Sequence, residues 1–188
     1  MSLNLIGHNS ATISPIGGGY IWFCQVNSDG TSAGDTFHAG PILKESEIND
    51  DAPFKEYPAE DATVYVMPGE RKVQITCTTY QRDTGMLTFA PTDAAGNYYA
   101  VLKQVSKNTI NGVYQYLFAP ICQIEQSVKY KTLGNEIAFK IWLNPAPANI
   151  TRTVWTGVSG AASVTFGGSA PSITVNQNQY YAWYNALS

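Results

Sequence analysis

Residues that carry chemistry are scarce in this chain. Only two histidines occur, His8 and His38, and both lie in polar stretches. The three cysteines lie far apart, each in an apolar run, and their spacing matches no metal site. They are Cys24, Cys77 and Cys122. We interpret them as reduced, buried, small hydrophobic residues. No Gly-rich phosphate loop and no Ser/His/Asp signature is present. The sequence therefore predicts a protein that is not an enzyme and that uses no cofactor and no metal.

Charge is equally scarce. Charged residues make up 13% of the 188 residues, about half of the roughly 25% that is typical of globular proteins. The formal net charge is −3, so nothing favours electrostatic binding of phosphate. Hydrophobic residues make up 44%, enough for one domain with a sizeable core. A surface with so few charges is suited to burial against further copies of the same chain.

Long apolar runs are also absent. The longest apolar stretches, such as residues 20–24, are far shorter than the roughly 20 residues that a membrane helix requires. Residues 1–11 contain no basic stretch followed by an apolar run, so we expect no signal peptide. These features predict a soluble protein that is made in the cytoplasm and has no membrane contact.

The sequence does contain many β-type segments. The clearest is residues 71–80, where Val73, Ile75 and Cys77 alternate with polar residues. This alternation is typical of a sheet with one buried face and one wet face. Further strands are predicted at residues 18–26, 64–67, 86–89, 113–124, 127–131, 136–143, 151–158, 162–166 and 172–175. The expected class is α+β, mainly β, an antiparallel β-sandwich or rolled barrel with one packed helix.

That helix is predicted at about residues 92–106. Thr92 and Asp93 supply residue types that cap a helix N-terminus. Lys103 and Lys107 lie near the expected C-terminus, where cations complement the helix dipole. An apolar stripe recurs at helical spacing, consisting of Tyr98, Val101, Leu102 and Val105.

Residues 34–62 are predicted to form a long loop. The segment holds eight of the fourteen acidic residues and three prolines, and long loops in compact domains are usually functional or disordered. Spaced apolar residues favour a loop that docks onto something, although a solvated acidic excursion is the alternative. The apolar candidates are Ile42, Leu43, Ile48, Phe54 and Tyr57.

Composition divides the chain into three parts. Residues 1–17 form a polar amino-terminal arm, residues 18–144 form the main β domain, and residues 145–188 form a nearly neutral extension. Within the extension Arg152 is the only charged residue. We expect the extension to be dispensable for the main fold but to pack against the domain or a neighbour. Its contact candidates are the aromatic residues Tyr180, Tyr181, Trp183 and Tyr184.

The order of these parts, over about residues 1–144, resembles the tail tube proteins of long-tailed bacteriophages. It matches in the polar arm, the first strand, the long loop, the alternating β region, the helix and the closing strands. A further similarity is the stretch from Tyr130 to Glu136 (Tyr-Lys-Thr-Leu-Gly-Asn-Glu) before an apolar strand.

The resemblance implies a structural virion protein. In that family, subunits form hexameric rings that stack into a tube, and their strands build a continuous inner barrel through which DNA passes without specific binding. The long loop contacts the adjacent ring, and the implied partners include the tape measure and tail terminator proteins. The expected location is the virion tail, after synthesis in the host cytoplasm.

Two alternatives remain open at this stage. The aromatic end of the chain and its low charge also favour a carbohydrate-binding β-sandwich, because Tyr and Trp rings can stack on sugars. Another virion part, such as a decoration or tail-completion protein, is the second alternative.

Overall fold

The computed structural model describes residues 19–31, 36–39, 45–58, 64–81, 97–104, 113–130, 135–153, 163–165 and 172–187. These residues form strands and turns, and no helix occurs among them. The strands are β1 Ile21–Val26, β2 Thr36–Ala39, β3 Glu45–Asp51, β4 Phe54–Pro58, β5 Val64–Pro68, β6 Lys72–Gln81, β7 Tyr98–Gln104, β8 Val113–Lys129, β9 Asn135–Leu143, β10 Ile150–Thr153, β11 Ser163–Thr165, β12 Ser172–Val175 and β13 Ala182–Leu187.

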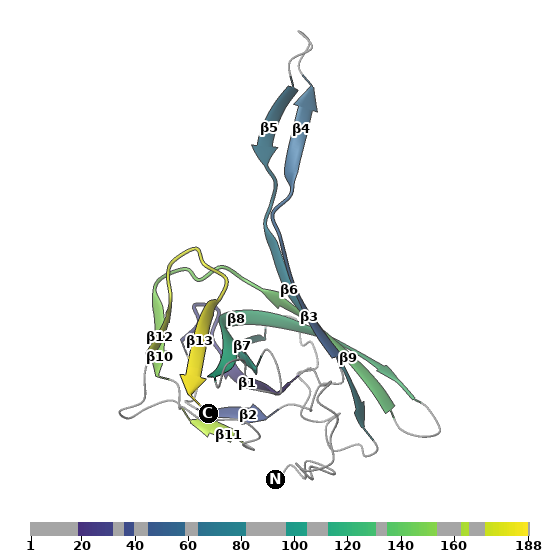
Figure 1. Ribbon diagram of the computed structural model, residues 1–188, viewed down its shortest axis with the longest axis vertical. Helices are drawn as coiled ribbons and strands as arrows, with labels where there is room; N and C mark the ends of the chain where they lie inside the picture. Colours follow the sequence, from purple (N-terminus) through teal and green to yellow (C-terminus); the bar gives the residue numbers. More distant parts are fainter. Residues whose placement is uncertain are drawn as a thin grey trace.

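One antiparallel sheet dominates and curls into a half-barrel (Figure 1). Its strand order is β11-β2-β1-β7-β8-β9-β6-β3, and β13 also pairs with β8. The long strand β8 joins two parts of the sheet: its first half lies between β7 and β13, and its second half pairs with β9. Pro120 lies where the register between β7 and β8 shifts, as expected for a residue that cannot donate a ladder hydrogen bond.

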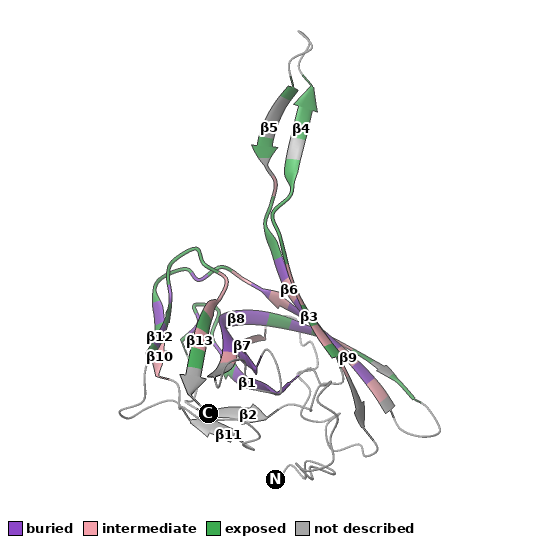
Figure 2. Ribbon diagram, in the orientation of Figure 1, coloured by how far each residue is buried: buried purple, intermediate pink, exposed green. Residues whose placement is uncertain are grey.

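Two apolar cores lie on opposite faces of the central strands β1, β7 and β8. One core surrounds Trp22 and Phe118 and includes residues of β10 and β12. The other surrounds Phe23 and Leu117 and includes the inward residues of β6 and β9. Figure 2 shows this buried band through the body of the molecule, while the projecting β4 and β5 are exposed. The central strands are therefore covered on both faces.

Burial on both faces explains why the predicted helix is wrong over Tyr98–Gln104, which form strand β7. Its residues 100–104 are all buried, so the segment lacks the polar–apolar alternation of a half-exposed strand. The remaining apolar residues then fall at helical spacing by coincidence. Residues 92–96 and 105–106 of the predicted helix, including Val105, lie outside the described residues.

The segment 34–62 is not a long loop throughout. It contains β2, β3 and β4, and β3 pairs with β6 while β4 pairs with β5. These strands were not predicted because the segment is rich in acidic residues and contains Pro53, and acidic residues and proline are depleted in strands. The acids are tolerated because β3 is an edge strand within the described part of the sheet, where charge discourages unwanted pairing.

Residues of the expected extension contribute to the main sheet and core. β13 pairs with β8 from Val113 to Phe118. Ile173 and Val175 of β12 are buried in the same core as Trp22. The geometry therefore gives no support to the expectation that residues 145–188 are dispensable for the fold.

The other strand predictions that fall on described residues are confirmed in type. Residues 73, 75 and 77 of β6 are buried and its residues 74, 76 and 78 are partly exposed. The two runs 113–124 and 127–131 form the single strand β8. The cysteines are free and buried, as predicted. The polar arm 1–17 and the predicted strand 86–89 lie outside the described residues.

Candidate functional site

A two-stranded ribbon projects from the half-barrel (Figure 1). We call β4 and β5 the ribbon. It continues the β3–β6 pair, but the two pairs are separated by a joint at Pro53 and Gly69. The amide of Gly69 donates a hydrogen bond of 2.6 Å to the Pro53 carbonyl oxygen. A Cβ on Gly69 would lie 2.5 Å from that oxygen, so this close approach requires glycine.

The ribbon exposes large apolar side chains on both of its faces. Phe54 and Val64 share one face, and Tyr57 and Met67 share the other, because side chains alternate along paired strands. Their exposed fractions are 70%, 54%, 48% and 54%. An isolated two-stranded ribbon is only marginally stable in water. Both faces of the ribbon therefore present large apolar side chains to solvent.

The root of the ribbon is held by the carboxy-terminal segment. Arg71 makes a two-pronged ion pair with Asp50, with Nε to Oδ1 at 2.7 Å. The hydroxyl of Tyr181 donates to Asp50 Oδ2 at 2.8 Å, and the hydroxyl of Tyr180 donates to the Arg71 carbonyl oxygen at 3.2 Å. The Arg71 guanidinium also lies 5.2 Å from the centre of the Tyr180 ring. These four residues, the root cluster, tie β3, β6 and the chain end together.

Hydrogen bonding sets the charge states in the root cluster. The Arg71 guanidinium holds the pKa of Asp50 below its usual value, and the hydroxyl of Tyr181 adds to this effect. Partial burial raises the pKa of Tyr181, as does its hydrogen bond to Asp50. Asp50 is therefore ionised and Tyr181 neutral at neutral pH, which are the states that the observed contacts need.

The outer face of β3, β6, β9 and β8 is open and polar. Paired residues across the four strands form rows, one of which runs Glu47, Thr76, Lys140 and Glu125. Lys140 lies 4.5 Å from the ring centre of Trp142 in the next row. This face includes an open hollow of about 570 Å³. It is lined by Glu45, Ser46, Glu47, Thr76, Cys77, Thr78, Glu125, Ser127, Ala138, Phe139 and Lys140.

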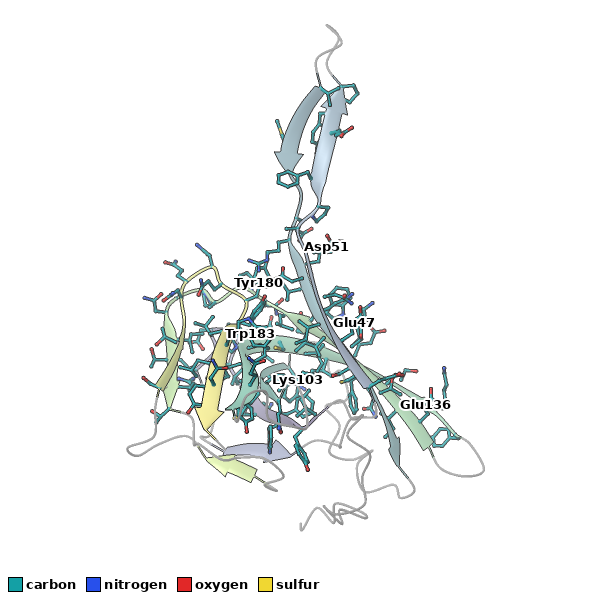
Figure 3. The ribbon with its side chains drawn as sticks, viewed as in Figure 1. Glu47, Asp51, Lys103, Glu136, Tyr180 and Trp183 are labelled. Carbon is teal, nitrogen blue, oxygen red and sulfur yellow. The ribbon has the colours of Figure 1, made fainter. Side chains whose placement is uncertain are left out.

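The end of the sheet farthest from the ribbon carries a further exposed aromatic residue. Tyr130 follows β8 and is 75% exposed. Its neighbour Lys129 lies 3.8 Å from Glu136 of β9, and the Lys129 side chain is 68% exposed. Figure 3 shows Glu136 at the end of the sheet opposite Asp51 at the root of the ribbon. The two ends of this sheet thus both present aromatic residues to solvent.

The predicted inter-ring residues are dispersed. Phe54 and Tyr57 lie exposed on the ribbon, whereas Ile48 packs partly buried against the second core. Ile42 and Leu43 lie outside the described residues. Val64 and Met67 also lie exposed on the ribbon, whereas the sequence predicted only that they belong to a strand. The pairing of β4 with β5 is what exposes them.

The predicted carboxy-terminal contact residues divide into three groups. Tyr180 and Tyr181 belong to the root cluster. Tyr184 packs against the first core, with its ring centre 6.2 Å from that of Tyr116. Trp183 is 53% exposed on β13 and meets Tyr181 edge-on at 5.8 Å. Arg71, which links most of these contacts, had no signal in the sequence beyond its charge.

Lys103 was expected near the C-terminus of a helix but lies on strand β7. It lies in the middle of the core on β7, only 1% exposed, and its Nζ donates a hydrogen bond of 3.0 Å to the Gln104 carbonyl oxygen. Burial lowers the pKa of Lys103 to about 8 and raises the pKa of the nearby Cys77 thiol to about 12. Figure 3 shows Lys103 within the body of the molecule, away from the ribbon.

Within the described ranges, no cluster of three or more His, Cys, Asp or Glu residues could hold a metal ion. The same part of the chain contains no helix long and apolar enough to cross a membrane. No protein-family model matches the sequence, and no curated protein sequence matches it significantly.

Proposed function

We propose that this protein is a structural virion protein of the tail tube type. In this proposal it self-assembles into hexameric rings that stack into a tube for DNA delivery. The observation that carries the proposal is the projecting ribbon, whose large apolar residues are exposed on both faces. A monomer gains nothing from such a ribbon, but stacked rings of subunits would cover it.

The open half-barrel supports lateral closure into a ring. β3 ends the described sheet and has no partner on its outer side within the described residues. Unpaired strand edges invite pairing with another chain, and closure into a ring removes them. The acids Glu45 and Glu47 on this edge would discourage pairing with unrelated strands while still permitting a specific neighbour.

The open, polar face of β3, β6, β9 and β8 supports the proposal of a DNA conduit. In a ring closed through β3, this face would line the lumen, with Glu47, Glu125 and neighbouring threonines directed toward the DNA. Acidic and hydroxyl side chains do not attract phosphate, so DNA could pass without the salt-dependent binding that Lys and Arg create. Lys140 also lies on this face, between Glu125 and Thr76. The neighbouring carboxylate of Glu125 offsets the positive charge of Lys140 locally.

The proposed partners are further copies of the same chain, together with a tape measure protein inside the tube and a terminator at its end. The proposed location is the virion tail. The protein would have no catalytic role and no cofactor.

Deleting the ribbon tests the proposal. A variant in which Asn-Gly replaces residues 52–70 leaves a three-residue loop, Asn-Gly-Arg71, between the paired residues Asp51 and Lys72 of β3 and β6. We expect a folded subunit that forms single rings or short oligomers, seen by electron microscopy, but no long tubes. As a matched control, Glu70→Ala at the ribbon root should leave tube length unchanged. Tubes of normal length from the deletion variant would exclude a stacking role for the ribbon.

One observation favours the second candidate, a carbohydrate-binding β-sandwich. Trp183 is exposed on β13, and an exposed indole ring can stack on a sugar. However, its neighbour Tyr181 lies edge-on to it and is hydrogen-bonded to Asp50, so the two rings form no flat platform. A glycan-binding measurement with the wild type and Trp183→Ala decides this alternative.

A further inference from the structure

The strand pairing that leads into the ribbon is interrupted at its root. The β3–β6 ladder ends with Asp51 paired with Lys72, and the β4–β5 ladder begins with Phe54 paired with Pro68. Two residues separate these pairs on the first strand and three on the second. This unequal count is that of a β-bulge, where the ladder is locally broken and the strand bends. The ribbon and the body sheet are therefore two separate ladders that are joined at the bulge.

Little backbone bonding fixes the joint. Pro53 has no amide hydrogen, so the hydrogen bond that its carbonyl oxygen accepts from Gly69 has no counterpart in the other direction. Within residues 52–53 and 69–71, which the structure describes, this is the one backbone hydrogen bond that crosses the joint. The ribbon projects away from the body (Figure 1), and its two strands contact mainly each other. The joint alone therefore leaves the direction of the ribbon weakly determined.

The root cluster supplies the contacts that the joint lacks. Arg71 lies inside the bulge, directly before β6. The hydroxyl of Tyr180 donates to the Arg71 carbonyl oxygen, and the Tyr180 ring lies against the Arg71 guanidinium. One side chain from the chain end thus contacts both the backbone and the side chain of a bulge residue. The hydroxyl of Tyr181 reaches the same arginine through Asp50. Figure 3 shows Tyr180 at the root of the ribbon.

We propose that Tyr180 and Tyr181 form a latch that sets the direction in which the ribbon leaves the half-barrel. With the latch closed, the bulge is held and the ribbon keeps one direction. With the latch open, the ribbon turns about the joint at Pro53 and Gly69. The side chains of Arg71 and Asp50 are 43% and 26% exposed, and exposed ion pairs are individually weak, so the latch opens without unfolding of the two cores. The inference does not depend on the proposed function, because every contact that it uses lies within one subunit.

Pulsed electron paramagnetic resonance measures the direction of the ribbon. Spin labels at Glu56→Cys on the ribbon and Gln123→Cys on β8 replace exposed side chains, and the native cysteines are buried, so labelling is directed to the two new thiols. Dilution into excess unlabelled chains restricts the measured distance to labels on one chain. With the latch intact, the label pair should give one narrow distance distribution. Adding Tyr180→Phe/Tyr181→Phe, which removes both latch hydroxyls and keeps both rings, should broaden it.

Hydrogen exchange supplies an independent measurement, and a matched variant supplies the control. Loss of one latch hydrogen bond, as in Tyr180→Phe, should speed exchange of the Gly69 amide about fivefold through local opening of the joint. The amide of Ile75, in a part of β6 that is paired on both sides, should exchange at an unchanged rate. Tyr184→Phe removes a buried hydroxyl that has no hydrogen-bond partner in the structure. This control should change neither the distance distribution nor the exchange of Gly69.

Three results would overturn the latch. The first is a distance distribution that stays narrow in the double phenylalanine variant, because the bulge would then be rigid by itself. The second is a distribution that is already broad with the latch intact. The third is exchange of Gly69 that rises only as much as exchange of Ile75, since that result would mean a general loss of stability. Whether the protein forms tubes affects none of these comparisons, as long as each variant is compared with the wild type in the same state of assembly.

Discussion

Truncation after Leu143 is predicted to unfold the protein. The change removes β10, β11, β12 and β13, and with them three large aliphatic side chains, Ile150, Ile173 and Val175, that are 7%, 5% and 0% exposed. Burial of one such side chain contributes about 1.5–3 kcal/mol, so the three together contribute roughly 5–9 kcal/mol. A domain of this size has a net stability of about 5–15 kcal/mol. The pairing of β13 with β8 is lost as well.

The assay is urea unfolding followed by circular dichroism. The truncated chain should show no cooperative transition. Ile173→Ala in the full chain should lower the free energy of unfolding by about 2–5 kcal/mol. Thr174→Ala changes an exposed neighbour on the same strand and should cost less than about 1 kcal/mol. If the truncated chain unfolds cooperatively with a stability within about 2 kcal/mol of the full chain, residues 145–188 are a separate addition after all.

Three further predictions concern single groups. Lys103→Met should stabilise the protein most below pH 8, by up to about 3 kcal/mol, because the lowered pKa of Lys103 makes its charged form costly in the fold. That advantage should shrink as pH rises from 8 to 10.5, and an advantage that is constant across this range would argue against a charged Lys103. Asp50→Asn should cost about 1 kcal/mol at pH 7 in thermal unfolding. Because the pKa of Asp50 is lowered in the fold, this cost should disappear as pH falls through that value, whereas a cost unchanged at pH 2 would contradict the ion pair. Mass spectrometry after alkylation in denaturant without reductant should count three free thiols, and a stoichiometric disulfide would contradict the buried, reduced cysteines.

Strands with one solvent-exposed face could be predicted from the sequence, whereas strands buried on both faces could not. In β6 and β9 the alternation is unbroken because one face is solvated, so both were predicted as strands, but their register could not be predicted. In β7 both faces are buried, and the sequence pattern then has no period of two. Strand type at such positions depends on neighbours that are distant in the chain, here β1 and β8.

The candidate site was predictable only in part. Phe54 and Tyr57 were identified as docking residues because they are apolar within an acidic segment. Their partners Val64 and Met67 needed the β4–β5 pairing to be seen as exposed. The role of Arg71 depends on contacts with Asp50 and with Tyr180, which is 109 positions later, and no local pattern encodes such a contact.

Cryo-electron microscopy of the purified full-length protein at increasing concentration tests the central claim most directly. We expect tubes of stacked six-fold rings, with the polar face of β3, β6, β9 and β8 around an open lumen and each ribbon seated between subunits of the next ring. Particles that remain monomers, or closed dimers without an axial channel, at every concentration and salt would contradict it.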